Sequence, residues 1–292
     1  MAHLCGHDAH TAMLLGAARL LAHHREELAA SVRLMFQPCE ESHPSGAPAM
    51  IADGALDGVD AALAIHMWLD EPAGCWGVRS GAVMASVDRV TITVHGRGGH
   101  AATPELCADP VVAAAQAVMA LQTVMSRRIP ARLASVLSLC SIHGGEAFNV
   151  IPERVTIAGT LRTHDEAIRA KIKRLCGEIC EGVARAADVR IEVVFDGDYP
   201  TTVNDSTQAD KVRTAIRDLF GPAALKEHEK RFGGEDFSCV LQRVPGCIVL
   251  LGAANEAKGA SHPLHSPRFR IDEDVLWQGS TLHARMALDH RR

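Results

Sequence analysis

The order of strand-like and helix-like segments between residues 88 and 195 is the feature that most constrains the fold of this chain. Asp88–His95 alternates apolar and polar residues, as a strand with one exposed face does. An Ala-rich helix is expected at Pro110–Arg127, with Asp109 as its N-cap and the proline at its first position. The remaining segments are a strand at about 133–142, a strand at about 153–162, a helix at about 165–187 and a strand at 189–195. The resulting order, β-α-β-β-α-β, is that of a ferredoxin-like unit.

The segments on both sides of this unit predict an α/β domain into which the unit is inserted. Helical and strand patterns alternate there, as is typical of an α/β architecture. We expect a helix near the start of the chain, capped by Asp8 or Thr11, and a last helix from Asp272 to about Ala287. Buried strands are expected at three short apolar runs, Ser31–Gln37, Asp60–His66 and Cys247–Leu251.

The length of the chain, 292 residues, is sufficient for two domains with separate cores. We place a discontinuous domain at residues 1–87 and 204–292, and the inserted domain at residues 88–203. The expected fold class is therefore α/β with a mixed sheet, carrying an inserted ferredoxin-like α+β domain.

Composition and charge exclude several classes of protein. Apolar residues make up 47% of the chain, which excludes a disordered protein, and no apolar run is long enough to cross a bilayer. The net charge of -5, with Lys and Arg scattered, gives no sign of a nucleic-acid partner. The nine cysteines form no CxxC pair and no secretory signal segment is recognised, so we expect the protein in the reducing cytoplasm.

Metal-binding side chains are concentrated in the segment Cys5–His10, which contains a thiol, two imidazoles and a carboxylate. A lone cysteine is usually a small buried hydrophobe, and a lone histidine is usually only hydrogen-bonded. The density of this segment favours a metal site formed by Cys5 and His7. Asp8 and His10 are expected to support the ligands or to cap the helix.

The ends of the three expected strands carry further groups of this kind. They lead to Glu40 and Glu41, to His66, and to a loop with His262 and His265. Because ligands in open α/β sheets gather at the carboxyl ends of strands, we expect these side chains to meet the Cys5–His7 turn.

The adjacent residues Glu40 and Glu41 allow two interpretations. On a protein surface, two neighbouring carboxylates are simply solvated. After an apolar strand and Pro38, however, a turn can direct them differently, so that one binds metal and the other accepts a proton from metal-bound water. Zinc lowers the pKa of bound water to about 7, so that a neighbouring carboxylate is a competent base.

Seven motifs occur in an order and at distances that resemble a known enzyme family. They are CGHDAHTAMLLGAARLL, FQPCEES, AIHMW, GRGGHAATPE, GGEAFNVIPERVTIAGTLRT, GGEDFS and LHSPRFRIDEDVL. With these motifs the chain resembles the dinuclear metallohydrolases that include hippurate hydrolase, N-acyl-amino-acid amidohydrolases and the plant auxin-conjugate hydrolases. The resemblance implies hydrolysis of the amide bond of small N-acyl amino acids by a metal-activated water.

The resemblance also implies roles for individual residues. Five residues match the family's metal ligands: Cys5, His7, Glu41, His66 and His265. Glu40 matches the general base. The family holds two divalent ions per subunit, and the thiolate and imidazole ligands favour zinc, with manganese, cobalt or nickel as alternatives.

For the inserted domain, the resemblance implies a lid that also joins two copies into a homodimer. His100, which follows a glycine-rich run, matches a histidine that reaches the partner subunit's active site and steadies the oxyanion. Asn149 and Arg162 match groups that position the substrate, and an Arg can bind a carboxylate through two parallel hydrogen bonds. The alternatives are a glycine turn with a purely structural role and an Arg that is only a surface charge.

Members of the family carry additional residues before the CGHD motif. We therefore interpret the sequence as an N-terminally truncated member with an incomplete catalytic domain. Two hypotheses follow: an active amidohydrolase, or a catalytically inactive fragment that binds metal or dimerises through the lid domain.

Overall fold

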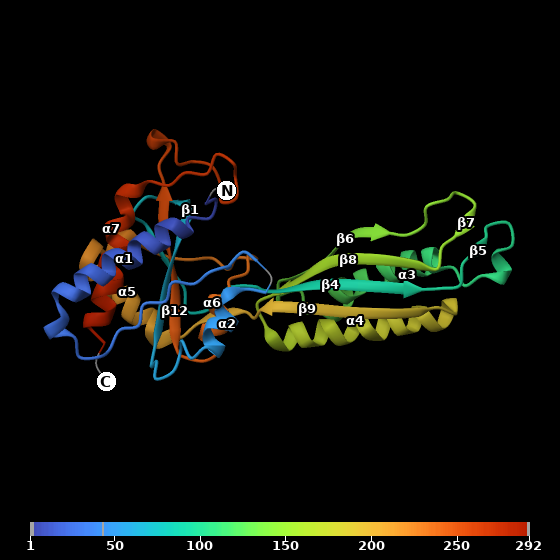
Figure 1. The fold of residues 1–292 in the computed structure, drawn as a ribbon, viewed down its shortest axis with the longest axis horizontal. Coiled ribbons are helices and arrows are strands. Elements are labelled where there is room, and N and C mark those ends of the chain that lie inside the picture. Colours follow the sequence, from blue (N-terminus) through green and yellow to red (C-terminus); the bar gives the residue numbers. More distant parts are fainter. Residues whose placement is uncertain (1–2, 43, 291–292) are drawn as a thin grey trace. The chain divides into compact units, whose positions relative to one another are not determined.

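The computed structural model describes residues 3–42 and 44–290, and its chain forms two compact units (Figure 1). Unit 1 comprises the described parts of Met1–Val83, Val203–Lys230 and Asp236–Arg292, and unit 2 comprises Met84–Thr202 and Arg231–Glu235. Both units combine helices with sheets, so the predicted α/β class is confirmed. The roles of catalytic domain and lid that we assigned to the two parts of the chain stay predictions.

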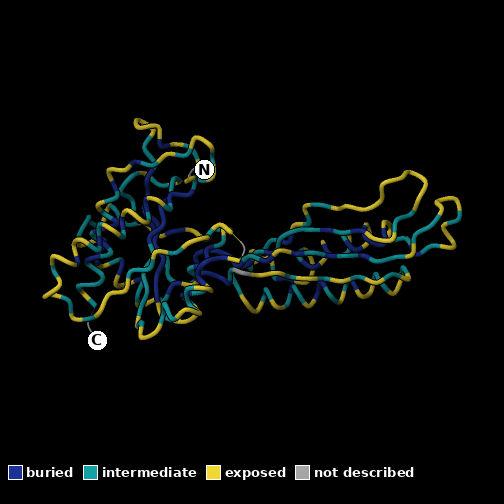
Figure 2. Tube along the Cα trace, in the orientation of Figure 1, coloured by how far each residue is buried: buried dark blue, intermediate teal, exposed yellow. Residues whose placement is uncertain are grey.

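Unit 1 is organised around a mixed four-stranded sheet in the order β1-β12-β2-β11. β1 is parallel to β12, β12 is antiparallel to β2, and β2 is parallel to β11. β12 is buried over all but its last residue, as Figure 2 shows. The strands of the sheet are β1 (Ala62–Pro72), β2 (Trp76–Val78), β11 (Leu225–Glu227) and β12 (Gly246–Ala254), and β3 (Gly81–Met84) pairs separately with β10 (Thr202–Asn204). The expected strands at 60–66 and 247–251 are thus present, but β1 continues to Pro72, so His66 lies within the strand and not at its end.

The helices of unit 1 pack on this sheet and on one another. α1 and α7 approach closely, because Ser280 Oγ donates a 2.9 Å hydrogen bond to the Met13 carbonyl and Gly279 leaves room for the Met13 side chain. Fully burying a side chain of this size contributes about 1.5–3 kcal/mol. The helical elements are α1 (His7–His23), η1 (Arg25–Glu27), α2 (Gly46–Ala52), α5 (Ser206–Phe220), η4 (Pro222–Ala224), α6 (Phe237–Leu241), η5 (Glu256–Lys258), η6 (Glu273–Val275) and α7 (Leu276–Leu288).

The expected strand at Ser31–Gln37 is wrong. Residues 31–39 have no regular secondary structure, and among the described residues no strand pairs with them. A strand needs a neighbour for its backbone N–H and C=O groups, and an apolar run does not supply one. Arg33 instead donates hydrogen bonds to the carbonyls of Gly54 and Ala55.

The predicted cap of the first helix is also wrong. α1 begins at His7, and its N-cap is Gly6, which has a φ of 83°. Thr11 Oγ1 donates a hydrogen bond to the His7 carbonyl one turn earlier, so it lies within the helix. Asp8 lies in the first turn, where its negative charge interacts favourably with the helix dipole.

The last helix begins later than expected. Asp272 caps the short 3-10 helix η6 by accepting a hydrogen bond from the Asp274 N–H, and α7 begins only at Leu276. A 3-10 turn before an α-helix is a common way to begin one, and the apolar spacing does not reveal it.

Unit 2 is a four-stranded antiparallel sheet, in the order β6-β8-β4-β9, packed with α3 and α4. This arrangement confirms the predicted ferredoxin-like fold. Asp109 caps α3 as expected, but the α-helix ends at Thr123 and a π-helical turn replaces its expected last residues. The elements are β4 (Ser86–His95), β5 (Gly99–His100), η2 (Pro104–Leu106), α3 (Pro110–Thr123), η3 (Val124–Arg128), β6 (Ser135–His143), β7 (Val150–Ile151), β8 (Arg154–Thr163), α4 (Glu166–Ala187) and β9 (Arg190–Tyr199).

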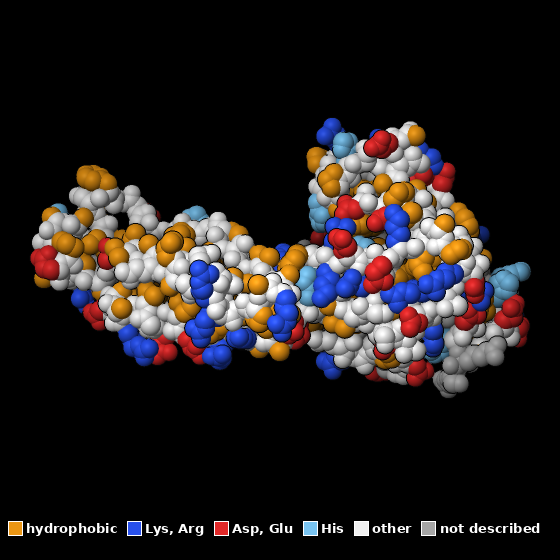
Figure 3. Space-filling view, turned by 180° about the vertical axis from the view of Figure 1, so that it is seen from behind, with side chains coloured by type: hydrophobic (Ala, Val, Ile, Leu, Met, Phe, Trp, Pro, Cys, Tyr) orange, Lys and Arg blue, Asp and Glu red, His pale blue; other side chains and the backbone are white. Residues whose placement is uncertain are grey.

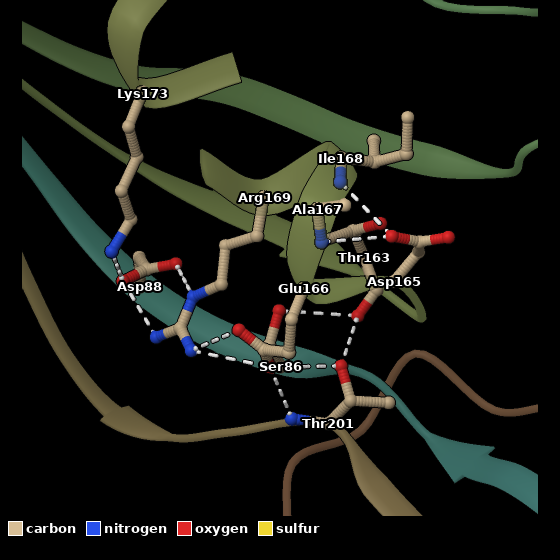
Figure 4. Close-up of polar contacts among 10 residues, drawn as sticks. All are labelled: Ser86, Asp88, Thr163, Asp165, Glu166, Ala167, Ile168, Arg169, Lys173 and Thr201. Carbon is tan, nitrogen blue, oxygen red and sulfur yellow. Dashed lines mark hydrogen bonds and ion pairs between the residues drawn. The ribbon is translucent and has the colours of Figure 1, made fainter. Parts of the chain in front are cut away.

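A network of charged side chains joins the sheet of unit 2 to the first turns of α4 (Figure 4). Asp88, which is fully buried, accepts hydrogen bonds of 2.7 and 2.9 Å from Arg169 and pairs with Lys173 Nζ at 2.6 Å. Glu166 pairs with the same Arg169 and accepts a 2.8 Å hydrogen bond from the Thr201 N–H. Because Asp88 lies near the start of β4 and Thr201 follows β9, the network holds the first and last strands of the unit on one helix.

In the described part of the chain, no helix is both long and apolar enough to cross a bilayer. On the face in Figure 3, Lys and Arg side chains lie among Asp and Glu side chains.

Candidate metal centre

The turn before α1 places Cys5 and His7 on either side of a glycine that the backbone requires. Gly6 has a φ of 83°, which residues with a side chain rarely adopt, and a Cβ there would lie 3.2 Å from Met67 Cβ. Cys5 is buried and His7 is half-buried. The sequence CGH therefore brings a thiol and an imidazole to the middle of β1, at His66 and Met67.

His66 reaches the same place from β1. Its Nε2 lies 3.7 Å from Cys5 Sγ, and its Nδ1 lies 2.7 Å from the Met67 carbonyl oxygen. A carbonyl oxygen only accepts hydrogen bonds, so Nδ1 carries the proton and Nε2 presents its lone pair to Cys5. Such a hydrogen bond is the usual way to orient a metal-binding histidine.

Glu40 and Glu41 enter from a tight turn, where the sequence predicts the end of a strand. The turn begins at Cys39, which has a φ of 58°. Asp236 holds the flanks of this turn, because its Oδ2 accepts a 2.6 Å hydrogen bond from Gln37 Nε2 and a 3.1 Å hydrogen bond from the Ala47 N–H. The segment is thus positioned by a residue that is distant in sequence, without strand pairing.

His265 comes from the loop between β12 and η6. Its φ is 66°, and its backbone N–H donates a 2.7 Å hydrogen bond to the Leu4 carbonyl. Its Nε2 lies 3.5 Å from Glu41 Oε1. The other histidine of this loop, His262, belongs to none of the groups of potential ligands among the described residues.

The structure therefore brings together the five residues predicted as metal ligands, all in unit 1. Cys5, His7 and His66 form one group of three converging atoms, and Cys5, Glu41 and His265 form a second group. His7 Nε2 also lies 3.7 Å from Glu40 and 3.8 Å from Glu41. Their roles as ligands and base stay predictions.

The distances fit the ligands of bound metal ions. Two ligand atoms on one tetrahedral ion, with bonds of about 2.0–2.3 Å, lie about 3.3–3.8 Å apart. The spacings from Cys5 to His66 and from Glu41 to His265, 3.7 and 3.5 Å, fall in that range. Thiolate, imidazole and carboxylate are the donors that zinc and similar ions bind. Cys5 belongs to both groups, so the arrangement suits two neighbouring ions that share one thiolate.

The protonation of the histidines also suits a cation. Burial lowers the pKa of His66 to about 4. Burial likewise lowers the pKa of His7, against the opposing effect of Glu41, and lowers that of His10 further. Near neutral pH these imidazoles are neutral, which a metal ligand must be.

The predicted lid residues lie in unit 2 and do not all lie together. β5 pairs with β7, which sets His100 opposite Val150 and therefore beside Asn149, and both predicted residues are exposed. The His100 Nδ1 accepts a 3.0 Å hydrogen bond from the Ala102 N–H. Arg162 lies near the other end of β8 and donates a 2.8 Å hydrogen bond to the Phe232 carbonyl.

Two side chains, those of Asp236 and His10, support the centre through contacts that the sequence did not predict. Asp236 belongs to the GGEDFS motif, for which no role was predicted, and its side chain holds the turn that carries Glu40 and Glu41. His10 was expected to support the ligands or cap α1, and its Nε2 in fact accepts a hydrogen bond from the Met67 N–H. Both residues stand in motifs, GGEDFS and CGHDAH, but neither motif indicates which backbone or side-chain group the residue will bind.

Comparison with known proteins shows the family of the chain. Residues 1–289 match the peptidase family M20/M25/M40. Thermostable carboxypeptidase 1 of Saccharolobus solfataricus is 38% identical over 98% of this chain and 72% of its own length. IAA-amino acid hydrolase ILR1-like 2 of Arabidopsis thaliana is 38% identical, over 99% of this chain and 66% of its own length. N-acetyl-L-cysteine deacetylase of Bacillus subtilis is 36% identical, over 95% of this chain and 65% of its own length.

A solved structure agrees with these relatives. The Bacillus subtilis YXEP protein, described as a dinuclear metal binding peptidase from the M20 family, has a TM-score of 0.83 and 32% identity, covering 98% of this chain and 72% of its own. The resemblance inferred from the motifs is thus confirmed, as is a metal-dependent hydrolase that acts on amide bonds in small molecules, and the dinuclear relative supports two divalent ions as the cofactor. The chain belongs to the peptidase family M20/M25/M40.

Proposed function

We propose that the chain hydrolyses the amide bond of N-acyl amino acids at this centre. The observation that carries the proposal is the pair of donor groups that share Cys5, with Glu40 beside them. Two relatives are, by their names, a hydrolase of IAA-amino acids and a deacetylase of N-acetyl-L-cysteine. These names support an acylated amino acid, of the hippurate type or a related conjugate, as the substrate class.

The proposed ligands are the five residues that converge in unit 1. Cys5, His7, Glu41, His66 and His265 would hold two divalent ions. We favour zinc, since a thiolate and three imidazoles are ligands it prefers, with manganese, cobalt or nickel as alternatives. When bound, such ions polarise the scissile carbonyl and make water more acidic.

Glu40 is the proposed general base. Its carboxylate lies 3.7 Å from His7 Nε2, and its side chain is only 20% exposed, so it stands at the edge of the donor groups. From there it accepts the proton of the attacking water and passes it to the nitrogen of the leaving amino acid.

Three residues of unit 2 are proposed to act on the substrate. His100 and Asn149 lie at an exposed end of the unit, where they are accessible to a substrate held by a partner subunit. We assign oxyanion stabilisation to His100 and substrate positioning to Asn149. Arg162 has five N–H donors, more than its hydrogen bond to the Phe232 carbonyl uses, and we assign it to the substrate carboxylate.

Unit 2 is also the proposed dimerisation domain. β6 is one of the two edge strands of its sheet, and edge strands offer unpaired backbone groups to another chain. Ile142 on β6 and Met119 on α3 are exposed apolar residues, and Figure 3 shows hydrophobic side chains along this unit.

The nine cysteines are all free thiols in the structure, which supports the reducing cytoplasm as the compartment.

Elemental analysis and hydrolysis assays test this function together. The purified chain should contain divalent metal and release amino acids from hippurate, N-acetyl or indoleacetyl amino acids. A chelator should abolish the release, and zinc or manganese should restore it. Substrates with an amidated carboxyl group are the matched control and should be cleaved more slowly. Bound metal or a stable dimer without hydrolysis of any substrate would support the inactive-fragment hypothesis instead.

A further inference from the structure

Two histidines bind the same buried residue of β1 through its two backbone polar groups. Met67 is fully buried, and its N–H donates a 2.9 Å hydrogen bond to His10 Nε2. Its carbonyl oxygen lies 2.7 Å from His66 Nδ1 and accepts the hydrogen bond from that nitrogen. Met67 is thus the residue through which His10 and His66 are connected.

These contacts fix the tautomers of both rings. Because His10 Nε2 accepts the hydrogen bond from the Met67 N–H, the ring proton of His10 must be on Nδ1. Neither ring nitrogen of His10 therefore has a lone pair available for a metal ion. His66 has its proton on Nδ1 and presents an unprotonated Nε2 to Cys5. His10 is therefore excluded as a ligand by the hydrogen bond that connects it to the ligand strand.

The rings also pack against one another. The centroids of His10 and His66 lie 4.5 Å apart at an interplanar angle of 62°, and the centroids of His7 and His10 lie 5.3 Å apart. His10 follows His7 by three residues on α1, so both face the same side of the helix. The His10 ring consequently lies beside the ring of His7 on its own helix and beside the ring of His66 on β1.

We propose that His10 is a positioning residue, which sets the orientation of His66 and the spacing between α1 and β1 for metal binding. This inference rests on the proposed metal centre. Hydrogen-bonding groups behind a ligand typically change metal affinity about 10- to 100-fold when removed. We expect an effect of this size from losing the acceptor that holds Met67.

Two variants separate the hydrogen bond from the packing. His10→Phe keeps a ring between His7 and His66 but cannot accept from Met67, whereas Gln in His10→Gln offers an amide oxygen as acceptor. Zinc affinity, measured by competition with a chromophoric chelator, should fall about 10- to 100-fold in His10→Phe and should largely return in His10→Gln. His283→Phe is the matched control, since His283 is a desolvated histidine of α7 near His10 and belongs to none of the donor groups among the described residues.

The absorption spectrum of the cobalt-loaded protein gives a second readout. The bands should change in His10→Phe, because a reoriented His66 alters the ligand field, and should be unchanged in His283→Phe. Wild-type zinc affinity and an unchanged cobalt spectrum in His10→Phe would overturn the inference. If neither the wild type nor any variant bound zinc, the metal centre itself would be contradicted. Proton–nitrogen correlation spectra of the metal-free protein would still show whether His10 carries its proton on Nδ1.

Discussion

The backbone N–H of His265 donates a 2.7 Å hydrogen bond to the carbonyl oxygen of Leu4. This contact joins the loop after β12 to the residue that precedes Cys5, so two proposed ligands from opposite ends of the chain share one backbone connection. The side chains then meet through Glu41, which lies 3.5 Å from His265 Nε2. The geometry of the centre thus depends on backbone contacts between distant segments, as well as on the ligand side chains.

Replacing Glu40 should separate catalysis from metal binding. Glu40→Gln removes the proposed base but keeps the shape of the side chain, so kcat should fall about 100- to 10,000-fold. Metal content, measured by elemental analysis, should stay at the wild-type value. Glu41→Gln is the matched comparison and should lose metal. Activity of Glu40→Gln within a few-fold of wild type would contradict the role of Glu40.

Replacing Cys5 should act mainly by weakening metal binding. Cys5 belongs to both donor groups, so Cys5→Ser should reduce the affinity for both ions and remove the thiolate-to-cobalt absorption band. Cys39→Ser is the control, because Cys39 is exposed, precedes Glu40 and belongs to neither donor group. Equal metal affinity in Cys5→Ser and Cys39→Ser would remove Cys5 from the list of ligands.

The buried network of unit 2 should be costly to break. Asp88→Ala leaves Arg169 and Lys173 without their buried partner, and losing one side of a buried ion pair costs about 3–5 kcal/mol. Urea unfolding followed by circular dichroism would measure this loss. Glu181→Ala removes an exposed partner of Arg185 and should change the free energy of unfolding by less than about 1 kcal/mol. Similar values for the two variants would show that the Asp88 network contributes little.

The stability of the metal-free protein should depend on His283 in acid. Burial lowers the pKa of His283 to about 4, whereas an unfolded histidine has a pKa of about 6.5. Between these values the unfolded chain binds a proton that the folded chain does not, so stability falls as the pH falls through this window. A shift of this size corresponds to about 3 kcal/mol between pH 7 and pH 4.

Unfolding of His283→Gln at several pH values checks this assignment. The variant should lose about 3 kcal/mol less than the wild type between pH 7 and pH 4, since the glutamine does not titrate. Parallel pH profiles for the two proteins would be the contrary result.

Local sequence was sufficient for most of the fold. Asp109 and Asp165 cap α3 and α4 where an acidic residue precedes a helical pattern, because a cap is formed within four residues. β4 alternates in burial, as its sequence predicts, and alternation is a property of neighbouring residues. The motifs also supplied the ligand candidates, since residue type and spacing are written directly in the chain.

The tertiary structure decided what these segments contact. Ser31–Gln37 has the composition of a strand, but strand formation depends on a partner that lies elsewhere in the chain. Asp236 holds the turn of Glu40 and Glu41 from about two hundred residues away, and His10 finds its acceptor role only when α1 meets β1. Residue type and spacing alone indicated which side chains can bind metal and where most of the helices and strands lie, because those properties are largely local. Hydrogen bonds between distant segments decided how the candidate ligands converge, which tautomers their histidines adopt and which residues hold them in place. No local pattern encodes these contacts.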